Sequence, residues 1–311
     1  MKLFRHHTDL PAEARGAAVA LGNFDGVHRG HRAVIAEAQA RAAALGAPSA
    51  VLTFEPHPRT LFRPADPPFR LTPLRIKARL IEAQGVDALF VLHFDEALSR
   101  MSAEQFVAEV LVGGLGARHV VAGYDFVFGH KRGGDMELLR REGAAHGFGV
   151  TEVRPVGQGD DIFSSTRVRS LLQEGDPRGA AAILGHPFEL EGRVEHGDKR
   201  GRTIGFPTAN VELGEYVRPR FGVYAVRAGI DRGGDTAWHG GVANLGRRPT
   251  VGGTVERLEA HLFDLDEDLY GRHLRVQLLD FIRPEAKFDS FDALKAQIAR
   301  DAEAARALLA G

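Results

Sequence analysis

The 311-residue sequence contains no cysteine, which excludes disulfides, thiolate nucleophiles and cysteine-ligated zinc. It also lacks an excess of one charge, since 40 lysines and arginines stand against 41 aspartates and glutamates. Any phosphate-binding charge must therefore be local, and we expect no nucleic-acid partner. No apolar run approaches membrane-spanning length, and the N-terminal MKLFRHHTDL lacks the apolar core of a signal peptide. We expect a cytoplasmic protein without a membrane partner; no pattern indicates its oligomeric state.

The sequence has the composition of an ordinary globular protein, with 44% hydrophobic and 26% charged residues. Its length exceeds that of a typical single core, so two domains are expected. The first half alternates apolar runs with amphipathic patterns, which predicts a mostly parallel sheet with helices on both faces. The expected strands are 17–21, 50–54, 88–94, 119–122 and 149–153, and the expected helices are 31–45, 74–84, 103–112 and 135–146.

The second half changes character after Asp176, because strand-like segments follow one another with glycine-rich turns between them. This pattern predicts a small antiparallel β-barrel, and the spacing of apolar residues over 291–309 predicts a helix that docks on it. We place the boundary between the two parts within 175–187. The expected strands are 188–195, 223–229, 236–244, 255–264 and 273–282.

The segment GNFDGVHRGH, Gly22 to His31, lies between an expected strand and an expected helix. A glycine-rich turn at a helix N-terminus directs free backbone N–H groups at one point and suits phosphate. His28 and His31 add two donors that can follow charge as it moves between phosphate oxygens. The alternative is a tight turn with solvated histidines.

Two other segments, TFEPHPR (53–59) and GYDFVFGH (123–130), also follow expected strands. The carboxyl ends of parallel strands meet at one edge of a sheet, where ligands collect, so the three segments should converge there. Each residue also has a purely structural interpretation. His57 could be a surface residue held rigid between two prolines, and Asp125 could stabilise a loop by hydrogen bonding.

The segment FSSTRVRSLLQEGD (163–176) opens with hydroxyl residues at a predicted helix start. Hydroxyl groups and arginines at a helix N-terminus can bind phosphate. The alternative is that the hydroxyls only cap the helix and the arginines lie on the surface.

The segment HGDKRGRTIGFPTAN (196–210) combines three glycines, three basic residues and, at its end, Thr208 and Asn210. Two neutral oxygen ligands on one face of a presumed strand suit a Mg²⁺ ion that already carries nucleotide phosphates. The alternative is a charged hairpin with a proline-restricted exit. No GxxxxGK[ST] loop occurs in the sequence.

The expected strand 255–264 alternates, with Leu258, Ala260 and Leu262 on one face and Arg257, Glu259 and His261 on the other. The polar face could simply be solvated. The segment NLGRRPT (244–250) is expected to form a barrel turn without chemistry of its own.

These motifs resemble those of the prokaryotic bifunctional riboflavin kinase/FMN adenylyltransferases (FAD synthetases). G-x-F-D-G-V-H-x-G-H is similar to the HxGH signature of nucleotidyltransferases, 163–169 to the ISSTxIR motif, and 197–210 to GxxxGRTxGFPTAN. Phe163 departs from the usual aliphatic residue, which we interpret as a packing substitution. The resemblance implies an α/β, Rossmann-like nucleotidyltransferase domain over 1–182 and a β-barrel riboflavin kinase domain with a C-terminal helix over 183–311.

By this resemblance, the first domain adenylylates FMN with ATP, giving FAD and pyrophosphate. His28 and His31 would be catalytic, and His57 and Asp125 would line the flavin site. ATP would be bound by Gly22, Asn23, Phe24, Asp25, Gly26, His28, His31, Ser165, Thr166 and Arg169.

The resemblance also implies that the second domain phosphorylates riboflavin with ATP, giving FMN and ADP. Glu259 would be the general base, and Thr208 and Asn210 would hold Mg²⁺. ATP would be bound there by Gly197, Gly201, Arg202, Gly205, Thr208 and Asn210.

Two other functions remain open at this point. One is a catalytically silent flavin- or nucleotide-binding regulatory protein on the same fold, against which the intact motif residues argue. The other is a nucleotidyltransferase for pantetheine phosphate or glycerol phosphate, which the kinase-like second half disfavours.

Overall fold

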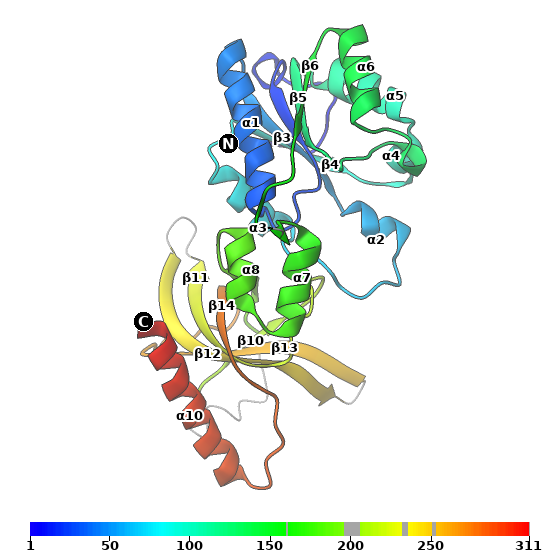
Figure 1. Cartoon of the computed structure of the whole chain (residues 1–311). Helices are drawn as coiled ribbons and strands as arrows, with labels where there is room; N and C mark the ends of the chain where they lie inside the picture. The colour runs from blue at the N-terminus through cyan, green and yellow to red at the C-terminus, as the bar shows by residue number, and fades with distance from the viewer. Residues whose placement is uncertain (160, 196–205, 232–235, 251–252, 311) are drawn as a thin grey trace. The chain divides into compact units, whose positions relative to one another are not determined.

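A computed structural model describes residues 1–159, 161–195, 206–231, 236–250 and 253–310. Contacts divide the chain into two compact units (Figure 1). The first unit comprises Met1–Pro67 and Thr72–Ser164, and the second comprises Pro68–Leu71 and Ser165–Gly311. Residues 165–182 thus pack with the second unit, while the functional division at 182/183 stays a prediction.

The first unit contains a six-stranded parallel sheet in the order β1-β4-β3-β2-β5-β6. The five expected strands are present. A sixth strand, β1, pairs with β4 at one edge; it is too short to give an apolar pattern in the sequence, and it was not predicted. Their bounds are β1 Lys2–Phe4, β2 Ala18–Leu21, β3 Ser49–Glu55, β4 Ala88–His93, β5 His119–Gly123 and β6 Gly149–Val153.

Alternate residues of the central strands enter two hydrophobic cores, one on each face of the sheet. On β3, Leu52 packs on the face covered by the segment Phe106–Gly114 and α6 (Met136–His146), and Val51 packs on the face covered by α1 (Arg29–Leu45) and α3 (Leu74–Glu82). Burial on both faces explains why these strands are continuous apolar runs in the sequence. The predicted parallel sheet with helices on both faces is confirmed.

The predicted helix 103–112 differs in detail from the structure. A first turn, α5 (Ala103–Gln105), begins with a capping box at Ser102 and continues as a π-helix, η2 (Phe106–Gly114). The wider winding shows in the bond from the N–H of Leu115 to the carbonyl of Val110, at 2.9 Å. Short elements complete the unit: η1 Ala12–Ala14, α2 Pro58–Phe62, α4 Glu96–Arg100, η3 His130–Arg132, β7 Gly157–Gln158 and β8 Asp161–Ile162.

The second unit contains a six-stranded antiparallel sheet in the order β10-β13-β12-β11-β14-β9. Its two edges approach each other just beyond β9, where the N–H of Glu195 donates to the carbonyl of Asn210 at 2.9 Å. The sheet is therefore a nearly closed barrel, as predicted. Its strands are β9 Phe188–Arg193, β10 Ala209–Glu212, β11 Gly222–Asp231, β12 Thr236–Thr250, β13 Gly253–Leu262 and β14 His273–Pro284.

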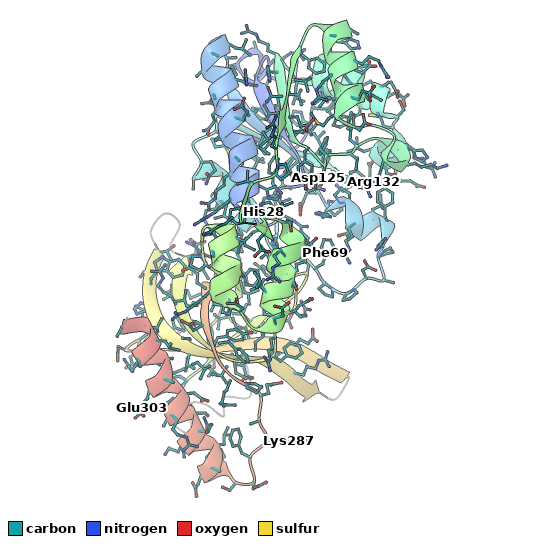
Figure 2. All side chains as sticks on the ribbon, in the orientation of Figure 1. His28, Phe69, Asp125, Arg132, Lys287 and Glu303 are labelled. Atoms are coloured by element: carbon teal, nitrogen blue, oxygen red, sulfur yellow. The ribbon has the colours of Figure 1, made fainter. Side chains whose placement is uncertain are left out.

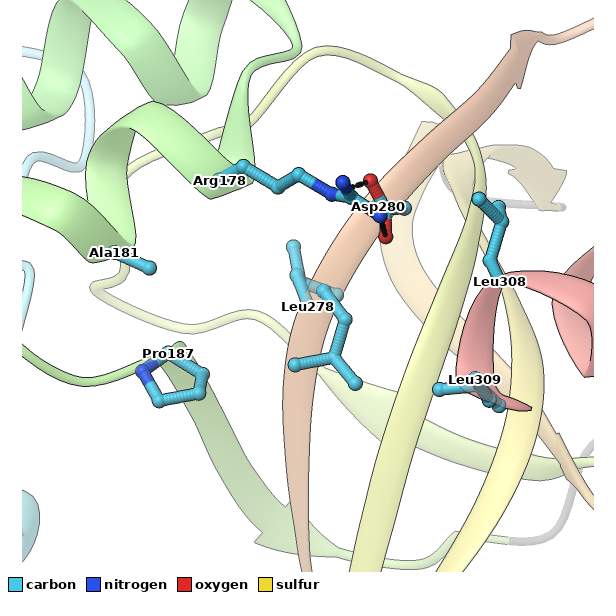
Figure 3. Close-up of a pocket in the computed structure, with 8 residues that line it drawn as sticks. Arg178, Ala181, Pro187, Leu278, Asp280, Leu308 and Leu309 are labelled. Carbon is cyan, nitrogen blue, oxygen red and sulfur yellow. Dashed lines mark hydrogen bonds and ion pairs between the residues drawn. The ribbon is translucent and has the colours of Figure 1, made fainter. Parts of the chain in front are cut away.

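Within the described residues of the second unit, three helices accompany the barrel. The predicted C-terminal helix is α10 (Phe291–Ala310), which packs Ala305 against Val223, Ala225 and Val242 and pairs Asp301 with Arg283 at 2.6 Å. The segment 175–187, in which the boundary is predicted, contains α8 (Pro177–Leu184), which follows α7 (Ser165–Glu174). A pocket of about 340 Å³ opens beside α8, β14 and α10 (Figure 3) and contains none of the predicted site residues; it is lined by Arg178, Ala181, Pro187, Leu278, Leu279, Asp280, Leu308 and Leu309.

In the part of the chain that the structure describes, no helix is both long enough and apolar enough to cross a membrane.

Candidate active sites

The turn from β2 to α1 holds the first motif in an unusual backbone conformation. Phe24 has φ +49°, Gly26 has φ +91° and Val27 has φ +42°. Positive φ in a non-glycine residue costs about 1–3 kcal/mol and is kept where surrounding structure enforces it, commonly at binding sites. Here the side chains of Phe24 and Val27 are almost fully buried in the core under α1, which anchors the turn.

A buried hydrogen-bond pair fastens this turn to the segment before α3. The Asp25 carboxylate accepts the N–H of Thr72 at 2.9 Å, and the Thr72 hydroxyl accepts the N–H of Gly26 at 2.7 Å. Asp25 is only 2% exposed. Its carboxylate therefore holds the turn in place, while the predicted contact of Asp25 with ATP stays a prediction.

The Thr72 hydroxyl offers a direct test of this fastening. Thr72→Val leaves the buried N–H of Gly26 without that acceptor, so we expect a loss of about 1–3 kcal/mol in the free energy of unfolding of the first unit, measured by urea denaturation. Thr72→Ser keeps the hydroxyl and should unfold close to the native protein. Equal stability of the two variants would contradict this assignment.

His28 and His31 lie together at the start of α1. Their rings stack with centroids 3.6 Å apart at 18°, and the N–H of His31 donates to Nδ1 of His28 at 3.3 Å. His28 thus caps the helix, and because its Nδ1 accepts, a neutral His28 carries its proton on Nε2. The pair presents imidazole N–H donors beside the first backbone N–H groups of a 17-residue helix, an arrangement suited to anionic oxygens.

The other two rim segments leave strands next to β2. His57, after β3, is the N-cap of α2 and accepts the N–H of Arg59 on Nδ1 at 3.1 Å. Asp125, after β5, is exposed. Because β3, β2 and β5 are adjacent and parallel, all three motifs emerge at one edge of the sheet, where His28 and Asp125 appear in Figure 2.

Phe163 and the residues after it fall on either side of the division between units. The guanidinium of Arg29 lies over the Phe163 ring at 5.9 Å, which agrees with a packing role for Phe163 at the start of α1. Ser165, Thr166 and Arg169 begin α7 in the second unit, where Arg169 donates to the carbonyl of Phe69 at 2.7 Å. Their grouping with the histidines around ATP stays a prediction.

The second candidate site is a row of polar residues across three strands of the barrel. Glu259 on β13 lies directly opposite Asn210 on β10 and Asn244 on β12. Side chains at paired positions share one face of the sheet, with Cβ atoms about 4.5–5.5 Å apart. The carboxylate is therefore flanked by two amides, and Asn244, to which the sequence analysis gave no role, belongs to this row.

His261, two residues beyond Glu259, was also missed as a site residue. Its Nδ1 lies 2.9 Å from the carbonyl of Pro207, so Nδ1 carries a proton that it donates, and its ring meets that of Phe206 edge-on at 5.2 Å. His261 thereby holds the backbone just before Thr208. The alternation predicted for this strand is confirmed, since Leu258, Ala260 and Leu262 are buried.

The predicted strand around Thr208 and Asn210 begins one residue later than expected. β10 starts at Ala209, so Thr208 precedes it, half-buried, while Asn210 is 7% exposed. Gly197, Gly201, Arg202 and Gly205 lie outside the described residues. Thr208 and Asn210 supply neutral oxygens, a donor set that fits Mg²⁺ bound chiefly through nucleotide phosphates.

Comparison with known proteins identifies two families along the chain. A family model described as FAD synthetase matches residues 10–167, and one described as Riboflavin kinase matches residues 184–309. Curated proteins named bifunctional riboflavin kinase/FMN adenylyltransferase are 45% identical in Escherichia coli K12 (98% of this chain, 97% of the relative) and 44% identical in Pseudomonas fluorescens (100% and 98%). The one from Bacillus subtilis is 39% identical (96% and 94%).

A crystal structure from Streptococcus pneumoniae, described as a macrolide-efflux protein, has a TM-score of 0.85 and 32% identity over 98% of both chains. Taken together with the two family models and the full-length curated relatives, these findings show that the chain belongs to the bifunctional riboflavin kinase/FMN adenylyltransferases.

Proposed function

We propose that the two reactions of this bifunctional enzyme use the two groups of residues just described. The turn at the start of α1 would serve the transfer of an adenylyl group from ATP to FMN, giving FAD and pyrophosphate. The Asn210–Glu259–Asn244 row would serve the phosphorylation of riboflavin by ATP, giving FMN and ADP. The observation that carries this proposal is that each group lies on its own sheet, at a position suited to its chemistry.

Adenylyl transfer needs positioning and charge stabilisation rather than a covalent enzyme intermediate. An oxygen of the FMN phosphate attacks the α-phosphorus of ATP, and pyrophosphate leaves. His28 and His31 would donate to the oxygens that gain charge, assisted by the N-terminus of α1. Ser165, Thr166 and Arg169 would hold the triphosphate, Gly22, Asn23, Phe24, Asp25 and Gly26 would shape the ATP site, and His57 and Asp125 would contact the flavin.

Phosphoryl transfer to riboflavin requires the primary alcohol to be aligned with the γ-phosphorus of ATP. Glu259 would accept a hydrogen bond from that hydroxyl and take its proton late, since an alcohol is a far weaker acid than a carboxylic acid. Thr208 and Asn210 would hold Mg²⁺, which neutralises phosphate charge when bound. Gly197, Gly201, Arg202 and Gly205 would complete the ATP site.

His261 provides a test of the kinase site away from the proposed base. His261→Ala removes the hydrogen bond to Pro207 and the contact with Phe206, so Thr208 loses its anchor. A lost hydrogen bond of about 1 kcal/mol corresponds to a rise of roughly fivefold to tenfold in the KM for MgATP in riboflavin phosphorylation. FMN adenylylation by the same variant should keep its KM. An unchanged KM for MgATP in the kinase assay would remove His261 from this role.

Incubation with riboflavin, ATP and Mg²⁺, followed by chromatographic identification of FMN and FAD, tests the proposal as a whole. Both products should form in that order. Flavin binding without ATP-dependent turnover would instead favour the regulatory protein, which the comparisons do not favour. Beyond the finding on membrane-spanning helices, a cytoplasmic location stays a prediction.

A further inference from the structure

Lys77 is a buried ammonium group that neither reaction, as assigned above, uses. It lies on α3, its side chain is fully buried, and it faces the sheet with Ile76 and Ile81. Fully buried lysines are rare and are kept where they are paired. Its ammonium group contacts the end of β3, the strand next to the one from which the histidine turn emerges.

Two hydrogen bonds of Lys77 reach the end of β3. Nζ lies 3.2 Å from Oε2 of Glu55 and 3.5 Å from Oγ1 of Thr53. The Glu55 side chain is 18% exposed and Thr53 is completely buried, so the contacts are formed mainly out of water. Electrostatic contacts of a charged group are stronger in such surroundings than in water.

Thr53 passes this connection on to the histidine turn. Its hydroxyl donates its single proton to the carbonyl of Asn23 at 3.0 Å, so it can only accept from Lys77. Asn23 is two residues after β2 and directly precedes Phe24, whose φ is positive. The Thr53 hydroxyl therefore links the ammonium of Lys77 to the backbone of the histidine turn.

Glu55 connects the same ammonium to the second rim motif. It is the last residue of β3, and His57, which caps the N-terminus of α2, follows two residues later. The buried charge is thus bonded to two residues of the TFEPHPR segment, Thr53 and Glu55, and it reaches the histidine turn on the adjacent strand through the Thr53 hydroxyl.

We propose that Lys77 is a positioning residue of the adenylyltransferase: through Thr53 and Glu55 it fixes the spacing between the histidine turn and the TFEPHPR segment. This inference rests on the proposed assignment of that site to FMN adenylylation. Lys77 touches neither substrate; it acts through the backbone of Asn23 and the side chain of Glu55. Group transfer is sensitive to such spacing, since a displacement of about 1 Å can cost on the order of a hundredfold in rate.

The test compares Lys77→Met with the double variant Glu55→Gln/Lys77→Met in the full-length protein. Methionine has a similar length without the charge, and glutamine at position 55 removes the carboxylate that would otherwise lose its ion pair with Lys77. The double variant therefore separates positioning from a folding defect caused by breaking that ion pair. Riboflavin phosphorylation by the same chain reports the concentration of folded second unit, and urea denaturation of each variant reports the folded fraction of the first unit, which contains Lys77. Ile81→Val, which trims a buried contact of α3 without touching the ammonium, is the matched packing control.

For both Lys77 variants we expect kcat for FMN adenylylation to fall about tenfold to a hundredfold and the KM for FMN to rise, with riboflavin kinase kinetics unchanged. Ile81→Val should keep both KM values. The proposal is overturned if the double variant keeps adenylylation kinetics within twofold of the native enzyme. It is equally overturned if all three variants lose kcat alike with unchanged KM, because that pattern reflects a smaller folded fraction.

The assay also separates this inference from the site assignment beneath it. If replacement of His28 and His31 leaves FAD formation intact, the assignment of the turn is wrong, whatever the Lys77 variants do. If the histidine variants fail to make FAD while the double variant makes it normally, the assignment stands and the role of Lys77 does not.

Discussion

Replacing Glu259 with alanine should stop the formation of FMN from riboflavin while FAD still forms from added FMN. The carboxylate lies in the middle of the barrel row, between Asn210 and Asn244, where it would align the riboflavin hydroxyl and take its proton. Loss of a general base lowers rates by about a hundredfold to ten-thousandfold. Chromatographic assay of both half-reactions on one protein preparation measures the effect.

Two further variants make the Glu259 result specific. Glu259→Gln keeps the size and hydrogen-bonding capacity of the side chain but cannot accept a proton at neutral pH, so it should lose nearly as much activity as the alanine variant. Glu212→Ala, on the adjacent strand and opposite Arg257, removes an exposed carboxylate and should leave phosphorylation intact. Loss of both half-reactions in a folded Glu259→Ala protein would contradict the assignment.

Replacing both histidines of the turn should have the opposite effect, so that riboflavin is converted to FMN and FMN accumulates. Hydrogen bonds to charged groups contribute roughly 1.5–3 kcal/mol each, so loss of both corresponds to roughly a hundredfold to ten-thousandfold in the rate of FAD formation. The readout is the ratio of FMN to FAD after incubation with riboflavin, ATP and Mg²⁺.

The choice of substitution matters at His28 because this residue also caps α1. An alanine would cost about 1 kcal/mol of helix stability, whereas asparagine is a good N-cap whose side-chain oxygen can accept the N–H of His31. We therefore expect His28→Asn/His31→Asn to fold and still lose FAD formation. His146→Asn, at the exposed end of α6, is the matched control and should make FAD normally. A double variant with native FAD synthesis would refute a role for the turn.

The sequence predicted those features that depend on local pattern. Strands such as 50–54 are apolar throughout because both faces of the parallel sheet are covered. Strand 255–264 alternates because one of its faces is buried in the barrel while the other is only half-buried. The convergence of three motifs followed from strand direction alone. β1 and the π-helical segment 106–114 gave no such signal, because one is only three residues long and the other shares the apolar spacing of an α-helix.

Features that depend on register or on distant partners could not be predicted from one sequence. The pairing of Asn244 with Glu259 depends on how β12 and β13 align, and the bond between Thr72 and Asp25 joins residues 47 positions apart. Lys77 did carry a signal: it precedes the buried Ile81 by four residues and therefore lies on the apolar face of its helix. A charged residue on such a face predicts a buried partner of opposite charge.

Counting bound nucleotides tests the central claim most directly. Isothermal titration of the native protein with a non-hydrolysable ATP analogue, in the presence of Mg²⁺ and saturating flavin, should give two equivalents per chain, and the His28→Asn/His31→Asn variant should weaken one of them and leave the other at native affinity. Saturation at a single equivalent per chain, with every flavin tried, would contradict the division of the two reactions between two nucleotide sites.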